Sequence, residues 1–310
     1  MSENIKSYFG ERPVYSDPYG HELVSSWVKE GKSFSFGRIG MSEMMLLDVF
    51  LQNTENPDFN QWRLHPNIPV STQSRYMGGL YPTEYNILKD FCNYYLSTLS
   101  EVDMFGTWTK STPTGANLAE DKLCIDYVNK DAIITEMSPY AAYHFDNPWT
   151  LGLEGKTLLI AHPFQQSIEN QKDKLNLVWS NKKLFPDNVK IKTLKVPLYD
   201  YLIEPEFPDW FSSLEDMKKR MESIDFDVLL VGAGFWGVPL SAHAKKIGKA
   251  GIHAAGATQL FPGIRGRRWD ENGEMDEYMN EHWVRPLPEE TPDPKFEDHK
   301  QFFHEGGCYW

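Results

Sequence analysis

The sequence predicts an α/β fold with a Rossmann-like, mostly parallel sheet covered by helices on both faces. Apolar, strand-like runs alternate with helix-like segments from Thr157 to Ala257, and this alternation is typical of βαβ units. One of these runs ends in Gly232-x-Gly234-x-x-Gly237, which opens a helix, as nucleotide-binding turns do. With 310 residues, 41% hydrophobic and 24% charged, the chain is long enough for one domain of this class.

In the first half of the chain, the spacing of apolar residues predicts helices and strands separated by glycine, proline and asparagine. Ser42 is the expected N-cap of the second helix, and Glu43 lies in its first turn, where a carboxylate suits the helix dipole. The expected elements are a helix over 21–30, a strand over 33–39, a helix over 42–51, a loop over 54–79, a helix over 82–99, and strands over 102–108 and 132–137.

In the second half, continuous apolar runs indicate strands that are buried on both faces. Ser212 or Ser213, followed by Glu215, predicts a capping box at the start of one helix. The expected elements are strands over 157–164, 189–197, 227–234 and 250–257, and helices over 167–179, 212–224 and 238–248.

Composition and charge exclude several classes of protein. The 31 basic and 44 acidic residues give a net charge of −13, which argues against nucleic acid as a general partner, although a local basic patch stays open. Three widely spaced cysteines form no CxxC motif, so a reducing, cytoplasmic location is expected. We expect no secretory signal and no membrane span. One domain over residues 1–270 is predicted, with a C-terminal tail over 271–310 packing back on it.

Arg38, Gly40, Ser42 and Glu43 stand where an expected strand meets a helix, at the edge of a parallel sheet where ligands bind. A buried arginine or carboxylate is costly unless it is paired or engaged with a ligand. Glu43 is therefore a candidate to bind a divalent cation or to act as a base on an acceptor hydroxyl. The alternative is that Glu43 only stabilises the helix N-terminus, with Arg38 as its partner.

His162, Phe164 and Ser167 follow another apolar strand and enter a helix that Ser167 is expected to cap. His162 is a candidate base or hydrogen-bond donor to a diphosphate. Ordinary hydrogen bonding at a strand end is the alternative for this histidine.

The glycines at 232, 234 and 237 predict a close approach of backbone N–H groups to a phosphate. A nicotinamide site also needs an acidic residue about 20 residues further on. The segment around His253 contains none, so a nucleoside diphosphate or a similar anion is the better expectation. A glycine-rich turn that merely packs remains the alternative.

A dense basic cluster follows the last βα unit in this acidic chain. Local positive charge beside a tryptophan suggests an anionic ligand such as a sugar nucleotide. The alternative is a surface cluster paired with Asp270, Glu271 and Glu274. The candidate substrate contacts from the last expected strand onward are His253, Thr258, Gln259, Arg265, Arg267, Arg268 and Trp269.

The segment SFSFGRIGMSEMMLL, residues 33–47, resembles the N-terminal strand–turn–helix of the GT-D-fold glycosyltransferases, whose signature is Arg-x-Gly-Asp-x-Glu. That family was first catalogued as a domain of unknown function beside bacterial adhesin- and polysaccharide-glycosylation genes. The resemblance extends through GKTLLIAHPF and DVLLVGAGFWGVPL and covers roughly residues 34–310, as a divergent branch.

The resemblance implies a nucleoside-diphosphate sugar donor, with a UDP-sugar as the first expectation, and a divalent Mn²⁺ or Mg²⁺ held through the Asp-x-Glu pair. Arg38, Gly40 and Glu43 match the signature, but Met41 stands at the aspartate position and cannot bind a hard cation. Either Glu43 alone, together with the diphosphate, holds a metal, or Arg265, Arg267 and Arg268 replace it. Metal dependence is therefore expected to be weak or absent.

The function expected from these residues and this resemblance is glycosyl transfer to a hydroxyl acceptor on a glycan, a glycoprotein or a modified nucleobase. Glu43 is the first candidate base and His162 the second. A non-catalytic nucleotide- or sugar-binding protein is one alternative, which Met41 favours. A nicotinamide-dependent oxidoreductase is the other, which the missing acid near His253 disfavours.

Overall fold

The computed structural model describes residues 4–53, 63–65, 68–69, 71, 74–75, 78–108, 116–197, 205–291 and 309. Within these residues, nine strands form one sheet and two short strands pair separately. The strands of the large sheet are β1 (Ile5–Phe9), β2 (Arg12–Tyr15), β3 (Phe34–Arg38), β6 (Met104–Gly106), β7 (Ile133–Thr135), β8 (Thr157–His162), β9 (Lys190–Lys195), β10 (Val228–Val231) and β11 (Ala250–His253). The separate pair is β4 (Arg63–His65) and β5 (Ile68–Pro69).

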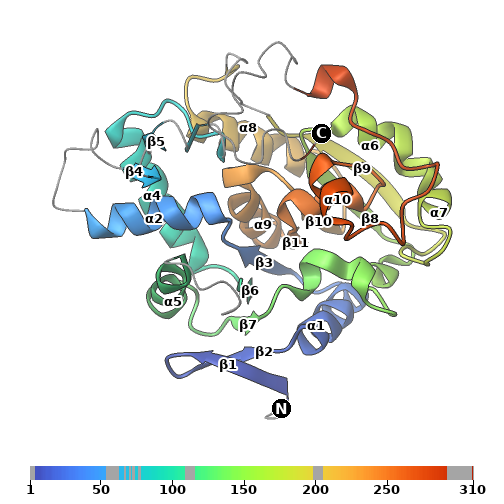
Figure 1. Ribbon diagram of the computed structural model, residues 1–310, viewed down its shortest axis with the longest axis horizontal. Helices are drawn as coiled ribbons and strands as arrows, with labels where there is room; N and C mark the ends of the chain where they lie inside the picture. The colour runs from blue at the N-terminus through green and yellow to red at the C-terminus, as the bar shows by residue number, and fades with distance from the viewer. Residues whose placement is uncertain are drawn as a thin grey trace.

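Helices lie on both faces of the sheet (Figure 1). The α-helices of the described chain are α1 (Asp17–Glu30), α2 (Met41–Gln52), α4 (Tyr85–Leu99), α5 (Ala116–Asp126), α6 (Gln165–Gln171), α7 (Leu175–Val178), α8 (Trp210–Glu222), α9 (Gly237–Lys246) and α10 (Arg267–Asn272). The short 3₁₀ helices are η3 (Ser138–His144), η4 (Trp149–Leu153), η5 (Lys172–Lys174), η6 (Gly234–Trp236), η7 (Ala255–Leu260) and η8 (Pro288–Glu290).

The large sheet has the order β1-β2-β7-β6-β3-β11-β10-β8-β9. Its strands pair in parallel, except that β1 runs antiparallel to β2. From β3 the chain moves outward to β6 and β7, and from β8 it moves outward to β9. The last two strands, β10 and β11, lie between β8 and β3. The expected mostly parallel α/β sheet is therefore confirmed, and the carboxyl ends of β3 and β11 are neighbours.

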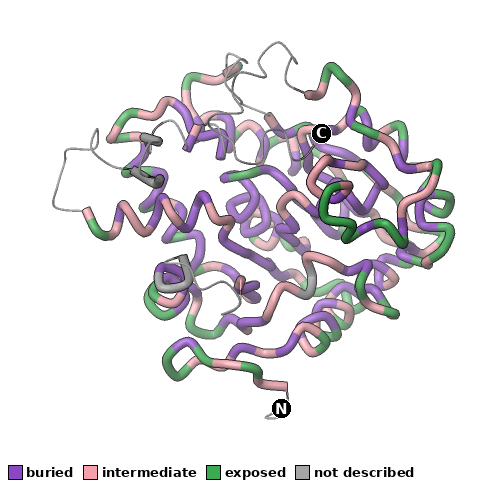
Figure 2. The backbone as a smooth tube through the Cα atoms, in the orientation of Figure 1, coloured by how far each residue is buried: buried purple, intermediate pink, exposed green. Residues whose placement is uncertain are grey.

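Each face of the sheet has its own hydrophobic core, because successive side chains along a strand point to opposite faces. Leu159 and Ala161 of β8 belong to the core beneath α2, α4, α5, α8 and α9. Leu158 and Ile160 belong to the core beneath α1, η4, α6 and α7. Figure 2 shows these buried segments through the middle of the molecule. Burial on both faces explains why the central strands are continuous apolar runs.

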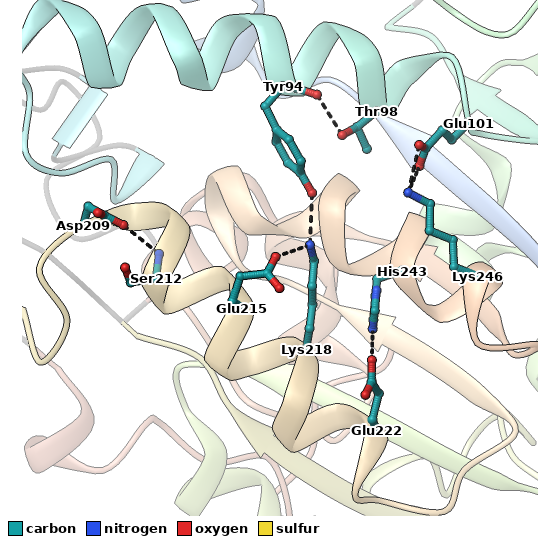
Figure 3. A network of polar contacts seen from close by, with 10 residues as sticks. All are labelled: Tyr94, Thr98, Glu101, Asp209, Ser212, Glu215, Lys218, Glu222, His243 and Lys246. Atoms are coloured by element: carbon teal, nitrogen blue, oxygen red, sulfur yellow. Dashed lines mark hydrogen bonds and ion pairs between the residues drawn. The ribbon is translucent and has the colours of Figure 1, made fainter.

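Polar contacts join the three helices that cover one end of the first core (Figure 3). Lys218 of α8 donates to Tyr94 of α4 at 3.3 Å and to Glu215 at 2.6 Å. His243 of α9 pairs with Glu222 of α8 at 2.7 Å. These contacts join α8 to both α4 and α9.

The expected helices are present, but their N-caps differ from the expectation. Gly40, not Ser42, is the N-cap of α2, so Ser42 is the second helical residue. The capping box at Ser212 or Ser213 is wrong, because α8 begins earlier and the carboxylate of Asp209 accepts from the backbone N–H of Ser212 at 2.7 Å. Apolar spacing locates the middle of a helix better than its first residue.

Ser167 is also not an N-cap, because α6 begins two residues earlier, after Phe164. Glu290 of η8 accepts instead from the backbone N–H groups of Gln166 at 2.6 Å and Ser167 at 2.9 Å. The hydroxyl of Ser167 donates to Glu290 and accepts from the N–H of Leu287. The described part of the C-terminal segment is thereby fastened to α6.

Three features of the described chain were not expected. The N-terminal hairpin of β1 and β2 extends the sheet beyond β7. The helix α5 follows β6 and packs against α2. The expected loop over 54–79 falls largely outside the described residues, and β4 and β5 lie within it.

Candidate functional site

The site is centred on the neighbouring carboxyl ends of β3 and β11. Arg38 is the last residue of β3 and His253 is the last residue of β11. The Nδ1–H of His253 donates to the carbonyl oxygen of Arg38 at 3.2 Å. Both residues are buried, with 3% and 1% of their surface exposed. The parallel pairing of the two strands therefore places a guanidinium group and an imidazole at one point of the sheet edge.

The guanidinium group of Arg38 lies between two aromatic rings. Its Cζ is 4.3 Å from the ring centroid of Trp108 and 4.7 Å from that of Tyr140. Such cation–π contacts stabilise a guanidinium and fix its plane. Within the described residues, Arg38 forms no ion pair and its Nε has no hydrogen-bond partner. The charge is thus held in place with unused donor capacity.

Glu43 of α2 contributes a buried carboxylate, 6% exposed, close to Arg38. Burial raises the pKa of Glu43, and a backbone hydrogen bond and the charge of Arg38 act in the opposite direction. The carboxylate folds back against the Cα of Gly40, where the Cβ of any other residue would overlap it. Gly40 is therefore needed for this position of Glu43.

A second buried carboxylate, Glu120 of α5, lies near the same guanidinium. It accepts from the hydroxyl of Thr107 at 2.7 Å and from the backbone N–H of Trp108 at 3.0 Å. Burial raises the pKa of Glu120, while these hydrogen bonds and the charge of Arg38 lower it.

Trp108 is held from two sides, because its indole N–H also donates to the carbonyl of Ile39 at 2.7 Å. Glu120 and Ile39 thereby fix the ring that covers Arg38. The strand-end rule that identified Arg38 also applies to Trp108, which follows β6 by two residues. No helix is expected from the sequence around Glu120, so the contact of this residue with Trp108 appears only in the structure.

Two further polar groups border the site without partners of their own among the described residues. They are the hydroxyl of Tyr95, from α4, and the Nε2 of His253. Burial, followed by the charge of Glu43, raises the pKa of Tyr95 well above its usual range. Burial, followed by the charge of Arg38, lowers the pKa of His253 to about 3. At neutral pH the imidazole is therefore uncharged, and its Nε2 is an acceptor.

The arrangement of Arg38, Glu43, Tyr95 and His253 provides one fixed positive charge, one carboxylate and two neutral hydrogen-bonding groups. A buried guanidinium is suited to bind a carboxylate or phosphate with two hydrogen bonds. A carboxylate whose pKa is raised is better suited to accept a proton than an ordinary surface glutamate. Anion binding and general-base chemistry are thus both available at this point.

The other catalytic candidate, His162, lies elsewhere. It ends β8, which is separated from β3 by β10 and β11, or by roughly 14 Å at the usual strand spacing. The backbone N–H of Phe164 donates to its Nδ1 at 3.1 Å, and burial lowers the pKa of His162 to about 3. Phe164 is part of a hydrophobic core. The structure does not bring His162 together with Glu43.

The glycine motif forms the turn between β10 and α9, with packed protein beside each glycine. A Cβ on Gly232 would overlap the carbonyl of Ala255, and one on Gly237 would overlap the Nε2 of His253. Gly234 has a φ of +49°, and its Cβ would lie 3.0 Å from the carbonyl oxygen of Gly78. These contacts account for the glycines through packing, which was the alternative to phosphate binding.

The basic cluster is largely paired with acidic residues of the same chain. Arg265 donates to Asp270 at 3.0 Å, Arg285 contacts the same carboxylate, and Arg267 lies 3.3 Å from Glu271. Such pairing was the alternative to ligand binding. It leaves less positive charge for a ligand than the sequence implies.

The remaining candidates in this region are mostly buried. Trp269 belongs to a hydrophobic core, and Arg268 is partly exposed. Thr258 and Gln259 are fully buried in η7. The side-chain amide of Gln259 donates to the carbonyls of Ile264 at 3.2 Å and Tyr309 at 3.0 Å. Gln259 therefore joins η7 to the C-terminal end of the chain.

The residues at the site do not suit the divalent cation that the family resemblance implies. Met41 packs against the hydrophobic core and has no oxygen to offer. Its neighbour Glu43 is one carboxylate beside a fixed positive charge. In the part of the chain that the structure describes, no group of three or more histidine, cysteine, aspartate or glutamate residues is placed to hold a metal.

No protein-family model and no curated protein matches this chain. Three solved structures are similar to it. The first is a selenomethionine-substituted domain of unknown function 1792, with a TM-score of 0.48 and 14% identity over 91% of this chain and 94% of that one. The second is described as the highly conserved domain of unknown function 1792 with a distinct glycosyltransferase fold, with a TM-score of 0.44 and 15% identity over 91% and 94%.

The third is a glycosyltransferase of the same domain type from Streptococcus sanguinis, with a TM-score of 0.40 and 10% identity over 89% of this chain and 95% of that one. The third is thus described as a glycosyltransferase, and the second as having a glycosyltransferase fold. Because all three TM-scores are below 0.5, a function for this chain has to be argued from its own residues.

Within the described residues, no helix is both long enough and apolar enough to cross a membrane.

Proposed function

We propose that this protein is a glycosyltransferase that moves a sugar from a nucleoside-diphosphate sugar to a hydroxyl acceptor. The observation that supports the proposal is that Arg38 and Glu43 lie close together in one buried site at the carboxyl end of β3. This edge of a parallel sheet is where ligands of α/β proteins bind. The segment that contains both residues is also the one that resembles the glycosyltransferase signature.

In the proposed reaction, Glu43 removes the proton of the acceptor hydroxyl as the acceptor oxygen bonds to the anomeric carbon of the sugar. The bond between that carbon and the diphosphate breaks, and the nucleoside diphosphate leaves with the electron pair. Arg38 stabilises the negative charge on this leaving group. Fixed charges aimed at developing charge are usually the largest catalytic term, and the rings beside Arg38 fix it before the donor binds.

The proposal is tested by incubating the full-length protein with a panel of radiolabelled nucleotide sugars, UDP-sugars first, and a mixture of saccharide acceptors. We expect release of the nucleoside diphosphate together with a labelled product for at least one donor. Heat-denatured protein is the control. If no donor is turned over and no nucleotide sugar binds in calorimetry, the proposal is wrong.

A non-catalytic nucleotide- or sugar-binding protein is the second candidate, and Met41 is the observation that favours it. Binding of a nucleotide sugar without turnover, under the same conditions, would support this second function. The nicotinamide alternative has less support, because no acidic side chain follows β11 in η7. A thermal-shift comparison of NAD with UDP separates it from the other two.

A further inference from the structure

The signature that this chain resembles places two carboxylates on a divalent cation, and this chain has a methionine at the first of them. A donor diphosphate still requires a positive charge, because an anion buried without a counter-charge is strongly disfavoured. The charge that replaces the cation must be close to Glu43 and must have no carboxylate already bound to it. Arg265 and Arg267 of the basic cluster, and Arg285 beside it, fail the second condition.

Arg38 meets both conditions. It lies close enough to Glu43 to influence its ionisation, and within the described residues it has no ion pair. Its side chain is 97% buried, since only 3% of the residue is exposed, and its Nε has no partner in that part of the chain. A guanidinium stays protonated at any pH at which proteins fold. Among the described residues, the fold therefore buries a full positive charge without an ion-pair partner, which is costly unless a ligand supplies one.

The surroundings of Arg38 fix its position rather than neutralise it. Trp108 and Tyr140 cover its plane, and Glu120 holds Trp108 through the backbone N–H at 3.0 Å. The neighbouring His253 is a neutral imidazole that donates to the carbonyl of Arg38. A planar donor fixed in this way is suited to form two parallel hydrogen bonds with a phosphate group.

We infer that Arg38 binds the diphosphate of the donor in place of a metal ion, so that this protein binds nucleoside diphosphates without a divalent cation. The inference rests on the proposed function for the identity of the anion. Glu120 is then a positioning residue, which acts on the ligand through Trp108 and Arg38.

The test is calorimetric titration of the full-length protein with UDP and, separately, with inorganic pyrophosphate, in EDTA and in Mn²⁺. We expect the Kd of each probe in EDTA to lie within about twofold of that in Mn²⁺. Arg38→Gln should weaken binding by about 10- to 150-fold, the effect of losing one charge-assisted hydrogen bond. Arg38→Lys keeps the charge but not the paired donors, so its Kd should lie between those of the wild type and Arg38→Gln.

Arg265→Gln is the matched control, because it removes an arginine that already has Asp270 as its partner. This variant should bind both probes as the wild type does. Circular dichroism verifies that the Arg38 variants fold, and the comparison of EDTA with Mn²⁺ uses only the wild type.

Binding that EDTA abolishes and Mn²⁺ restores would overturn the inference and leave the proposed function intact. Wild-type affinity in a folded Arg38→Gln variant would also overturn it. If neither UDP nor pyrophosphate binds the wild type under either condition, the inference fails together with the nucleotide-sugar donor of the proposed function.

Discussion

Glu43 begins α2 with its carboxylate folded over Gly40, where burial raises its pKa. Glu43→Gln keeps the shape of the side chain and removes its capacity to accept a proton. We expect sugar transfer to fall by roughly 100-fold or more, the usual contribution of a general base, with the fold retained. A radiometric transfer assay measures this, with Glu271→Gln, a largely exposed glutamate outside the site, as the control. Turnover at the wild-type rate would show that Glu43 is not the base.

Gly237 provides a second test at the scale of one residue. Gly237 has the helical φ of −59°, and in a helix Gly→Ala ordinarily stabilises by up to about 1 kcal/mol. Here the added Cβ would overlap the Nε2 of His253. We therefore expect Gly237→Ala to destabilise by about 1–3 kcal/mol, as overpacking does. Urea unfolding measures the change.

The double variant Gly237→Ala with His253→Ala is the control for this overlap. Removing the imidazole leaves room for the methyl group, so the two substitutions should be less destabilising together than the sum of their separate effects. If the two effects simply add, the overlap with His253 does not explain the glycine, and a ligand at the turn becomes the better explanation.

The sequence identified Arg38 and Glu43 because they belong to a strand end and to the helix that follows it. Only the structure places His253 at a strand end, since the expected strand continued to residue 257. The residues that complete the site could not be found in this way. Trp108, Tyr140 and Glu120 reach Arg38 from β6, η3 and α5, and only the sheet order brings these elements beside β3. The pairing of the C-terminal arginines was foreseen as an alternative, since acidic residues follow them directly.

Among the elements, the strands β8, β10 and β11 were predicted well because their runs are apolar and bounded by glycine or proline. The strand β9 was predicted because its polar and apolar residues alternate. The hairpin of β1 and β2 was missed, because its strands are short and its edge strand has exposed polar residues. The expected helix starts are one residue late at α2 and two residues late at α8. A cap depends on one side-chain hydrogen bond, which apolar spacing does not report.

Asp209 is such a cap, and Figure 3 shows its carboxylate beside the backbone N–H of Ser212. Asp209→Ala removes the acceptor, and we expect a loss of about 1 kcal/mol in the free energy of unfolding. Asp209→Asn, which keeps an oxygen in place, should lose only a fraction of this. Urea unfolding of the two variants and the wild type measures these differences in the free energy of unfolding. Equal stability of the alanine variant and the wild type would mean that α8 starts without this cap.

At the scale of the whole molecule, the fold buries both acidic side chains, Glu43 and Glu120, and histidines, His162 and His253. Burial raises the pKa values of Glu43 and Glu120, so the folded state binds protons there more readily than the unfolded chain does. These two groups therefore favour folding as the pH falls through their folded-state pKa values. Histidines with lowered pKa values have the opposite effect.

His162 and His253 each titrate at about 3 in the folded protein, chiefly because burial disfavours the charged ring, against an ordinary value of 6.5. Below pH 6.5 the unfolded chain takes up protons that the folded chain cannot. The stability that these histidines provide is therefore complete above pH 6.5 and is lost as the pH falls toward 3. Each histidine contributes a slope of at most about 1.4 kcal/mol per pH unit in this window. His243, half-buried beside Glu222, has the same sign, since burial lowers its pKa as well.

We expect the free energy of unfolding of the wild type, measured with urea, to fall between pH 6 and pH 4. His162→Gln removes one of the two imidazoles whose pKa burial lowers to about 3, and it lies outside the site at Arg38. Its slope in this window should be smaller than that of the wild type by up to about 1.4 kcal/mol per pH unit. Above pH 7 the two slopes should coincide, which provides the internal control. A variant that keeps the wild-type slope between pH 6 and pH 4 would show that His162 becomes charged inside the folded protein, and that water reaches the carboxyl end of β8.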